Sequence, residues 1–216
     1  MVTPEGLVRS GTSWEAVPFV AEITLLSLTA AGQTGLWDLW DRSERDAPPF
    51  WAFPWAGGQA LARYILDNPG TVRGRRVLDA ASGSGLVAIA AAKAGAASVV
   101  AGDVDPHAVT AIEINAQANG ATVTARAFDL AAGDAGGAEV VLAADVFYQR
   151  ELAGFALRFL RRAAGAGADV LVSDPGRAYL PAAALTRLAS YQVPVLSVLE
   201  DAPVKEVTVY RLASAP

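Results

Sequence analysis

The hydrophobic positions of this chain alternate between short apolar runs, typical of buried strands, and longer segments with helical spacing. From residue 76 onward the two kinds follow each other regularly. A strand, a crossover helix and a second strand form a parallel pair, so this order predicts an α/β domain with right-handed crossovers. The expected strands cover residues 76–80, 98–102, 122–128, 139–143, 168–173, 195–199 and 205–211, and the expected helices cover 57–68, 85–94, 106–119, 150–164 and 181–190.

The expected sheet has seven strands that are mostly parallel, with helices on both faces. Only Glu200-Asp201-Ala202-Pro203 and its immediate flanks separate the last two strands. A connection this short is typical of a hairpin, so we expect the last strand to run antiparallel to the others.

The N-terminal part of the chain lacks this regular pattern. We expect residues 1–48 to be an extension that packs on the core and residues 49–216 to form the main domain. Within the extension, we expect residues 1–16 to be loosely ordered and residues 31–49 to form a loop with a short helix. Residues 17–30 fit strand and helix equally well.

A Gly-Ser-Gly turn joins the first expected strand of the sheet to an alanine-rich helix. The strand ends in Asp79, the turn holds Gly83 and Gly85, and about 20 residues later a second apolar run ends in Asp103. Glycines let the backbone approach a ligand, and the helix N-terminus offers free N–H groups. The second acid can accept hydrogen bonds from ribose hydroxyls, so the pattern predicts a site for an adenosine-containing cofactor.

The turn alone does not name the cofactor, because Gly83-Ser84-Gly85-Leu86-Val87-Ala88 also fits the dinucleotide pattern G-x-G-x-x-A. Asp79 distinguishes the two. A carboxylate at that position would repel a pyrophosphate, whereas it would attract the ammonium and sulfonium groups of S-adenosylmethionine. The residues therefore favour a methyl-donor site over a nucleotide site, and a strand-turn-helix without a ligand is the third interpretation.

Asp145-Val146-Phe147-Tyr148 follows the fourth expected strand, and two interpretations of it are open. In one, Asp145 caps the next helix and Phe147 packs in the core. In the other, the segment forms part of an amine-processing site. Lysine is protonated at neutral pH and then has no lone pair for attack on a methyl group. Such a site needs a carboxylate to orient the amine and an aromatic lip that tolerates cationic, partly methylated intermediates.

Three further segments are expected at the same edge of the sheet. Asp129 ends the third strand, either near the adenine amino group of the cofactor or as an ordinary loop acid. The segment 49–59, which includes Trp55, is too aromatic for a solvent loop, so it plugs one face of the core, lines the cofactor, or does both. Asp174-Pro175-Gly176-Arg177 follows the fifth strand, either as a tight turn or as part of the pocket wall.

Composition narrows the class of protein. The chain is 53% hydrophobic and 18% charged, which indicates a folded globular protein, and its net charge of −5 excludes a general nucleic-acid surface. It has no cysteine and one histidine, His107, so we expect no disulfide and no metal site. The sequence shows neither a long apolar run nor a signal pattern, and we expect a soluble, cytoplasmic protein with no membrane or nucleic-acid partner.

Several of these segments together resemble one known family. Residues 51–69, 79–85, 103–106, 145–148 and 174–177 occur in the same order and spacing in the electron transfer flavoprotein β-subunit lysine methyltransferases. The likeness covers most of residues 15–212, and the W-A-x-x-W-x-G-G-Q, D-x-F-Y and D-P-G-R segments are more selective than the cofactor turn. The resemblance implies the Rossmann-like fold of class I methyltransferases, S-adenosylmethionine as cofactor, and methylation of lysine side chains in a folded protein.

The resemblance also carries roles to individual residues. Asp79, Gly83, Gly85 and Asp103 match the family's cofactor positions, and Asp145 with Tyr148 matches its acid–aromatic motif. The expected cofactor contacts are Trp55, Asp79, Ala81, Gly83, Gly85, Asp103, Asp129 and Asp145, and the expected catalytic residues are Asp145 and Tyr148. Ala81 departs from the family, which usually has a glycine there. We expect its methyl group to be tolerated only if the backbone keeps a negative φ.

The expected substrate is the electron transfer flavoprotein β subunit, a ribosomal protein, or both, and a monomer is favoured. One alternative is a methyltransferase that acts on a small-molecule amine or on a terminal amine of a ribosomal protein. Another is a module that binds the cofactor without catalysis, which the presence of both Asp145 and Tyr148 disfavours.

Overall fold

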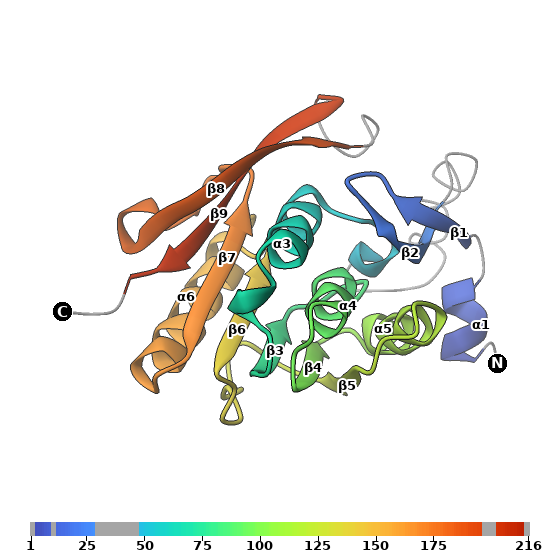
Figure 1. Ribbon diagram of the computed structural model, residues 1–216, viewed down its shortest axis with the longest axis horizontal. Helices are drawn as coiled ribbons and strands as arrows, with labels where there is room; N and C mark the ends of the chain where they lie inside the picture. The colour runs from blue at the N-terminus through green and yellow to red at the C-terminus, as the bar shows by residue number, and fades with distance from the viewer. Residues whose placement is uncertain (1–2, 10–11, 29–47, 196–201, 214–216) are drawn as a thin grey trace.

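The computed structural model describes residues 3–9, 12–28, 48–195 and 202–213. A twisted sheet runs through the centre of this part of the molecule, with helices on both sides (Figure 1). Its strands are β3 (Arg76–Ala80), β4 (Ser98–Asp103), β5 (Thr124–Ala127), β6 (Val140–Ala144), β7 (Asp169–Asp174), β8 (Leu185–Pro194) and β9 (Val204–Leu212).

The order of the strands in the sheet is β5-β4-β3-β6-β7-β9-β8. Strands β3 to β7 pair in parallel, and β9 runs antiparallel to both of its neighbours. The expected seven-stranded, mostly parallel sheet with an antiparallel last strand is therefore confirmed. This last strand is inserted between β7 and β8, so β8 forms the edge.

Helices α3 (Ala56–Asp67), α4 (Leu86–Lys93) and α5 (Pro106–Ala118) lie on one side of the sheet, and α6 (Arg150–Gly165) covers the other. Alternate residues of the central strands enter two separate cores. Val77 of β3 packs in the core that includes α3 and α4, whereas the next residue, Leu78, packs in the core that includes Phe159 of α6. This period of two is what a parallel sheet covered on both faces requires.

The N-terminal residues are more ordered than their sequence led us to expect. Residues 4–9 form α1 (Pro4–Arg9), and β1 (Thr12–Val17) pairs with β2 (Val20–Leu28) in an antiparallel hairpin. For residues 4–9 and 12–16 the expectation of a loosely ordered segment was wrong, because these short elements are stabilised by packing against the domain, with Val8 fully buried. A loop with a short helix was expected over residues 31–49, and residues 31–47 of it lie outside the described residues.

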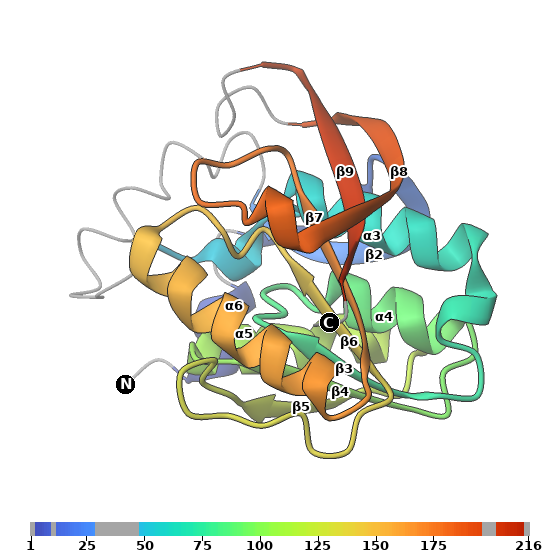
Figure 2. The same ribbon diagram turned by 90° about the vertical axis from the view of Figure 1, so that its left-hand side faces the viewer.

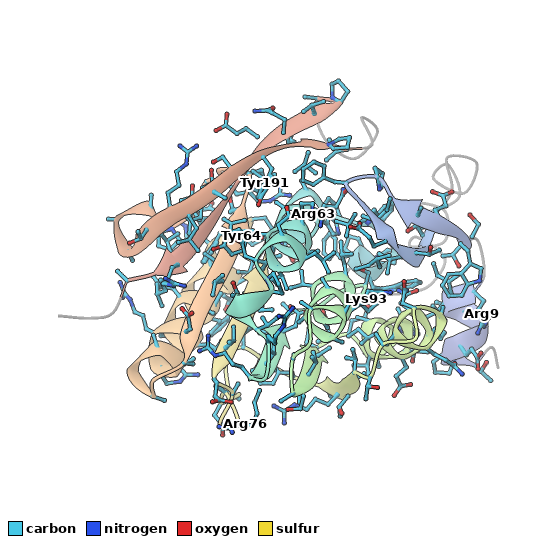
Figure 3. All side chains as sticks on the ribbon, viewed as in Figure 1. Arg9, Arg63, Tyr64, Arg76, Lys93 and Tyr191 are labelled. Atoms are coloured by element: carbon cyan, nitrogen blue, oxygen red, sulfur yellow. The ribbon has the colours of Figure 1, made fainter. Side chains whose placement is uncertain are left out.

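Side chains of α3 lie against two neighbouring elements, the strands β2 and β8 (Figure 3). Arg63 forms an ion pair with Glu22 of β2, at 2.8 Å between Nη1 and Oε1. Tyr64 of α3 and Tyr191 of β8 both pack against the core that includes α3 and α4. The N-terminus of α3, which contributes to the candidate site, is therefore fixed by a well-packed helix body.

The segment after Pro181 corrects one prediction. A helix was expected over residues 181–190, but only the 3₁₀ turn Ala182–Ala184 is helical, and the chain then enters β8. Figure 2 shows β8 and β9 as a long, bent hairpin. The strand expected at 195–199 lies largely outside the described residues, whereas the one expected at 205–211 is confirmed as β9. None of the helices in the described part of the chain combines the length and apolar character needed to cross a bilayer.

Candidate active site

A cavity of about 480 Å³ lies at the carboxyl ends of the parallel strands. This volume is within the range of sites that hold a small molecule or cofactor, roughly 300–1,000 Å³. Most of the predicted site residues line it, namely Trp55, Asp79, Ala81, Gly83, Asp103, Asp129, Asp145 and Tyr148. Gly85 is not among the lining residues, because it lies behind the turn against Ile112 of α5. The structure thus brings together side chains from four different strand ends.

Asp79 ends β3 beneath the glycine turn and is 1% exposed. Its Oδ2 accepts hydrogen bonds from the Ser82 hydroxyl and, at 3.0 Å, from the Ala88 N–H. Burial raises the pKa of Asp79 to about 7, although both hydrogen bonds oppose this rise. The carboxyl group therefore holds the turn to the start of α4 while it lines the cavity.

Ala81 adopts the left-handed conformation that glycine tolerates best, with φ of 57°. The expectation that the methyl group would be accepted only at negative φ was wrong. Gly83 also has a positive φ, of 56°, and Gly85 begins α4 with φ of 85°. A left-handed conformation costs an L-residue roughly 1–2 kcal/mol, so the turn carries local backbone strain at Ala81.

Asp103 is held in place by two backbone donors from different segments. Its Oδ2 accepts from the Gly83 N–H at 2.8 Å, and its Oδ1 accepts from the Asp105 N–H at 3.0 Å. Burial raises its pKa in spite of these bonds. Each carboxylate oxygen can accept about two hydrogen bonds, so Asp103 can still accept from a ligand hydroxyl while it is fixed to the turn.

Asp129 lies on the exposed rim of the cavity, just beyond β5. Its Oδ1 accepts from the Ala131 N–H at 2.8 Å, which forms a tight turn after the strand. The side chain can act as a loop acid and a cavity wall at once, and the two interpretations from the sequence are compatible.

Asp145 is fixed by both its backbone conformation and its side-chain contacts. It has φ of 55°, its side chain is only 11% exposed, and its two oxygens have different partners. Oδ2 accepts from the Gly58 N–H at 3.0 Å, and Oδ1 accepts from Arg177 Nη2 at 3.3 Å. Burial raises the pKa of Asp145 to about 6, Arg177 opposes the rise and Asp174 adds to it.

Of the two interpretations of the 145–148 segment, the simpler one is wrong for Asp145 and correct for Phe147. Asp145 does not cap the helix that follows it, because Gln149 is the N-cap of α6. Its carboxylate instead accepts from the Gly58 N–H in the first turn of α3. The carboxylate can come this close because residue 57 is glycine, and a Cβ there would overlap it. Phe147 packs in the core, as the simpler interpretation expected, with 1% exposure.

Three aromatic rings form a rim around the cavity. Phe50 contacts Tyr148 with ring centroids 5.6 Å apart and Trp55 with centroids 5.9 Å apart. The Trp55 Nε1 donates to the Phe50 carbonyl at 2.8 Å, which fixes the indole plane. The same segment also places Trp51 and Phe53 in a buried core, so it both lines the cavity and fills one face of the domain.

Two features of the cavity were not anticipated from the sequence. Trp51 Nε1 is buried and has no hydrogen-bond partner among the described residues, although the residue lines the cavity. Arg177 lines the cavity and pairs with Asp145. The sequence marked 174–177 as a tight turn or as part of the pocket wall. Arg177 is part of the wall, Asp174 is not a lining residue, and the pairing of Arg177 with Asp145 is what the sequence did not indicate. An ion pair between two loops 32 residues apart has no local signal in the sequence.

The chain has relatives of known class over most of its length. It is 38% identical over 181 residues to the electron transfer flavoprotein β-subunit lysine methyltransferase of Xenopus laevis, which covers 81% of this chain and 71% of the relative. It is 40% identical over 166 residues to the rat protein of the same name, covering 73% of this chain and 62% of the relative. The chain belongs to the electron transfer flavoprotein β-subunit lysine methyltransferase family.

Two further comparisons concern a part of the chain and its fold. Residues 60–147 match the family model described as ribosomal protein L11 methyltransferase. The magnesium protoporphyrin IX methyltransferase of Synechocystis, solved with bound S-adenosylhomocysteine, has a similar fold, with a TM-score of 0.52 at 17% identity over 83% of this chain and 95% of that one. The Rossmann-like class I methyltransferase fold expected from the sequence is confirmed.

The cavity has several features of a site for an adenosine-containing cofactor, the class of ligand that the sequence predicts. Its volume suits a small molecule, and two fixed acids lie at adjacent strand ends where an adenosine ligand would lie in such a fold. The buried indole N–H of Trp51 supplies a donor that lacks a partner within the described protein. A buried donor of this kind is costly unless something satisfies it, which favours a ligand with acceptor atoms.

Proposed function

We propose that this chain is an S-adenosylmethionine-dependent protein-lysine N-methyltransferase that uses the cavity at the carboxyl ends of its strands. One observation carries the proposal: Asp103, Asp145 and Tyr148 line a single cavity in a chain that belongs to a lysine methyltransferase family. Neither a binding module nor a structural protein needs an acid and an aromatic side chain beside the cofactor turn.

The turn residues and two acids would hold S-adenosylmethionine, which when bound supplies an electrophilic methyl group on a sulfonium centre. Asp103 would accept hydrogen bonds from the ribose hydroxyls, and the turn from Asp79 to Gly83 would lie against the methionine part. Asp129, which lines the cavity at its rim, would accept a hydrogen bond from the adenine amino group. The Trp51 Nε1 would donate to an acceptor of the cofactor. The carboxyl group of Asp79 would be close to the cofactor's cationic groups, which favour its ionised form.

Asp145 would orient the acceptor amine and is not suited to remove its proton. Even with its pKa raised to about 6, it is a far weaker base than lysine, whose pKa is about 10.4. The proton would therefore pass to solvent, and turnover should rise from pH 7 towards pH 9 as the neutral amine becomes more abundant. The rings of Trp55 and Tyr148 would face the amine and tolerate methylated, cationic products through cation–π attraction.

The expected acceptor is the electron transfer flavoprotein β subunit, because that protein is in the names of the relatives. A ribosomal protein is the second candidate, because the L11 methyltransferase model matches residues 60–147. The net charge of −5 favours a locally basic acceptor surface around the target lysine. We also propose that the enzyme is a cytoplasmic monomer, which cell fractionation and sedimentation would test.

Cofactor binding is tested by calorimetry on the purified chain. We expect binding of S-adenosylmethionine and S-adenosylhomocysteine and no binding of NAD. Asp103→Ala removes charge-assisted hydrogen bonds worth about 1.5–3 kcal/mol, so affinity should fall about 10- to 150-fold. Asp134→Ala, which changes an exposed acid outside the cavity lining, is the matched control and should bind normally. Binding of NAD, or unchanged affinity in Asp103→Ala, would exclude this assignment of the site.

The acceptor is tested with purified proteins. Labelled methyl donor is supplied with the electron transfer flavoprotein β subunit, with ribosomal protein L11, or with a free small amine, and the product is located by mass spectrometry. We expect label on a lysine of the β subunit. Label on an α-amino group of the ribosomal protein, or turnover of the small amine alone, would favour the alternative function.

A further inference from the structure

We propose that Arg177 is a positioning residue of the methyl-transfer site, which holds the Asp145 carboxylate charged and correctly oriented for the acceptor amine. This inference rests on the proposed function and adds a residue to it. It accounts for the whole Asp174-Pro175-Gly176-Arg177 segment, which the cofactor turn and the acid–aromatic motif leave without a role.

The segment forms a turn whose backbone is fixed at three points. Asp174 is 1% exposed at the end of β7, where it pairs with Thr208 of β9. Its Oδ1 accepts from the Gly176 N–H at 2.7 Å and from the Arg177 N–H at 2.6 Å. Gly176 has φ of 88°, a value that glycine adopts at little cost. The turn therefore begins at an interior strand of the sheet, β7, and its fixed backbone sets the direction of the Arg177 side chain.

The Arg177 side chain contacts Asp145, which lies 32 residues earlier in the chain. The contact joins one guanidinium nitrogen to Oδ1 at 3.3 Å, and the other oxygen of Asp145 accepts from the Gly58 N–H of α3. Both side chains line the cavity. A carboxylate oxygen can accept about two hydrogen bonds, so this single-nitrogen contact leaves room for an amine donor from the cavity side.

The charge of Asp145 depends on few neighbours. Burial and the Asp174 carboxylate favour its neutral form, whereas Arg177 and the Gly58 N–H at the start of α3 favour its ionised form. Of these two stabilising groups, only Arg177 carries a full positive charge. Without it, the pKa of Asp145 would rise above its value of about 6 and approach neutral pH. A protonated carboxyl group would no longer attract a cationic amine.

The first experiment measures the Asp145 pKa directly and needs no substrate. The full chain is labelled with ¹³C at aspartate carboxyl groups and titrated by NMR, and the Asp145 signal is assigned by its loss in Asp145→Asn. We expect the pKa of Asp145 to rise by about one unit or more in Arg177→Met, the usual effect of removing an adjacent opposite charge. Arg177→Lys, which keeps a positive charge without the guanidinium geometry, should show a smaller rise.

Arg150→Met is the matched control, because this arginine lies over the Tyr179 ring at 5.1 Å and has no contact with Asp145 among those described. It should leave the Asp145 titration unchanged. Equal Asp145 pKa values in the wild-type chain and in Arg177→Met would overturn the proposal. Because this readout does not use turnover, it remains decisive even if the chain methylates no lysine.

The second experiment measures kcat at pH 7 and at pH 9 with the acceptor that the assay on purified proteins identifies. If the pKa of Asp145 rises by one to two units, the kcat of Arg177→Met should be about 2- to 10-fold below that of the wild-type chain at pH 7. At pH 9 it should be close to the wild-type kcat measured at the same pH. Affinity for S-adenosylhomocysteine should stay within about 2-fold. The same loss of kcat at both pH values would overturn the role of Arg177 in keeping Asp145 charged, and an unchanged kcat at pH 7 would overturn the proposal as a whole. So would a 10-fold weaker affinity, which would instead make Arg177 a cofactor ligand.

Discussion

Ala81 shows how one methyl group can be accepted in a conformation that suits glycine. Its φ of 57° is in the left-handed region, where an L-residue is strained by roughly 1–2 kcal/mol. We expect Ala81→Gly to raise the free energy of unfolding by up to about 1 kcal/mol, since part of the relief is offset by the greater freedom of glycine in the unfolded chain. Denaturant unfolding with an unchanged m value would measure the gain.

Gly83→Ala is the reverse substitution in the same turn. Gly83 has φ of 56°, and an added Cβ would meet nothing closer than the Trp51 Cα at 4.0 Å. The change should therefore cost about 1–2 kcal/mol through backbone strain alone. If Ala81→Gly destabilised the chain as much as Gly83→Ala does, relief of backbone strain at residue 81 would not govern the stability of the turn.

Asp145 supports the first turn of α3 and has a proposed chemical role, and the two can be tested separately. In Asp145→Asn the side-chain oxygen can still accept from the Gly58 N–H, but the charge is lost. We expect turnover to fall by about 100-fold or more while cofactor affinity changes little. Tyr148→Phe keeps the ring beside Phe50 and should lose less activity. Near-normal kcat in Asp145→Asn would reduce this residue to a support for the first turn of α3.

The site residues illustrate what a sequence can reveal about a site. Asp79, Asp103 and Asp145 follow apolar runs that end at one edge of the sheet, so local pattern and topology together place them in one cavity. The partners of these residues were not predicted. The Asp145–Arg177 ion pair and the unpartnered Trp51 Nε1 depend on how distant loops of the described chain approach each other, and no local periodicity records that approach.

At the scale of whole elements, the first turn of α3 packs closely against Asp145 in the loop after β6. A Cβ on Gly57 would lie 2.7 Å from Asp145 Cγ, whereas a Cβ on Gly58 would meet only Leu86 Cδ2, at 3.7 Å. Gly57→Ala should therefore displace the carboxylate, lower kcat and destabilise the fold. Gly58→Ala is the matched control in the same helical turn.

Alanine is favoured over glycine in a helix by about 1 kcal/mol. Gly58→Ala should therefore be neutral or slightly stabilising, and Gly57→Ala should lose this benefit to the clash. Thermal unfolding and turnover of the two variants, measured side by side, test the fit. Equal stability and activity of the two would show that the loop after β6 can move away at no cost.

The strand β8 shows why local pattern failed in one place. Leu185 and Leu188 are three residues apart and follow Pro181, a combination that is typical of the start of a helix. The backbone groups instead pair with β9 over the whole length of β8, with an irregularity between Arg187 and Ala189 that interrupts the alternation of a strand. Pairing with a later segment thus outweighed local propensity. Strands β3, β4, β6 and β7, which contain buried apolar runs, were predicted correctly.

At the scale of the molecule, the candidate site concentrates buried carboxyl groups whose pKa values are all raised. Burial raises the pKa of Asp79 to about 7 and that of Asp145 to about 6, and it also raises those of Asp103 and Asp174. In the unfolded chain these groups titrate near pH 4. Between pH 4 and 7 the folded state therefore binds more protons than the unfolded state, so stability falls as pH rises.

The free protein should therefore be more stable at pH 5 than at pH 7.5, by about 2 kcal/mol or more, since each unit of pKa shift corresponds to about 1.4 kcal/mol. Urea unfolding at the two pH values measures the difference. Asp79→Asn removes the carboxyl group whose pKa is raised to about 7, so it should flatten this dependence, whereas Asp67→Asn changes an exposed acid paired with Arg63 and should leave it intact. A wild-type chain that gained stability from pH 5 to pH 7.5 would contradict the prediction, because it would mean that the buried acids of the cavity are stabilised in their charged forms.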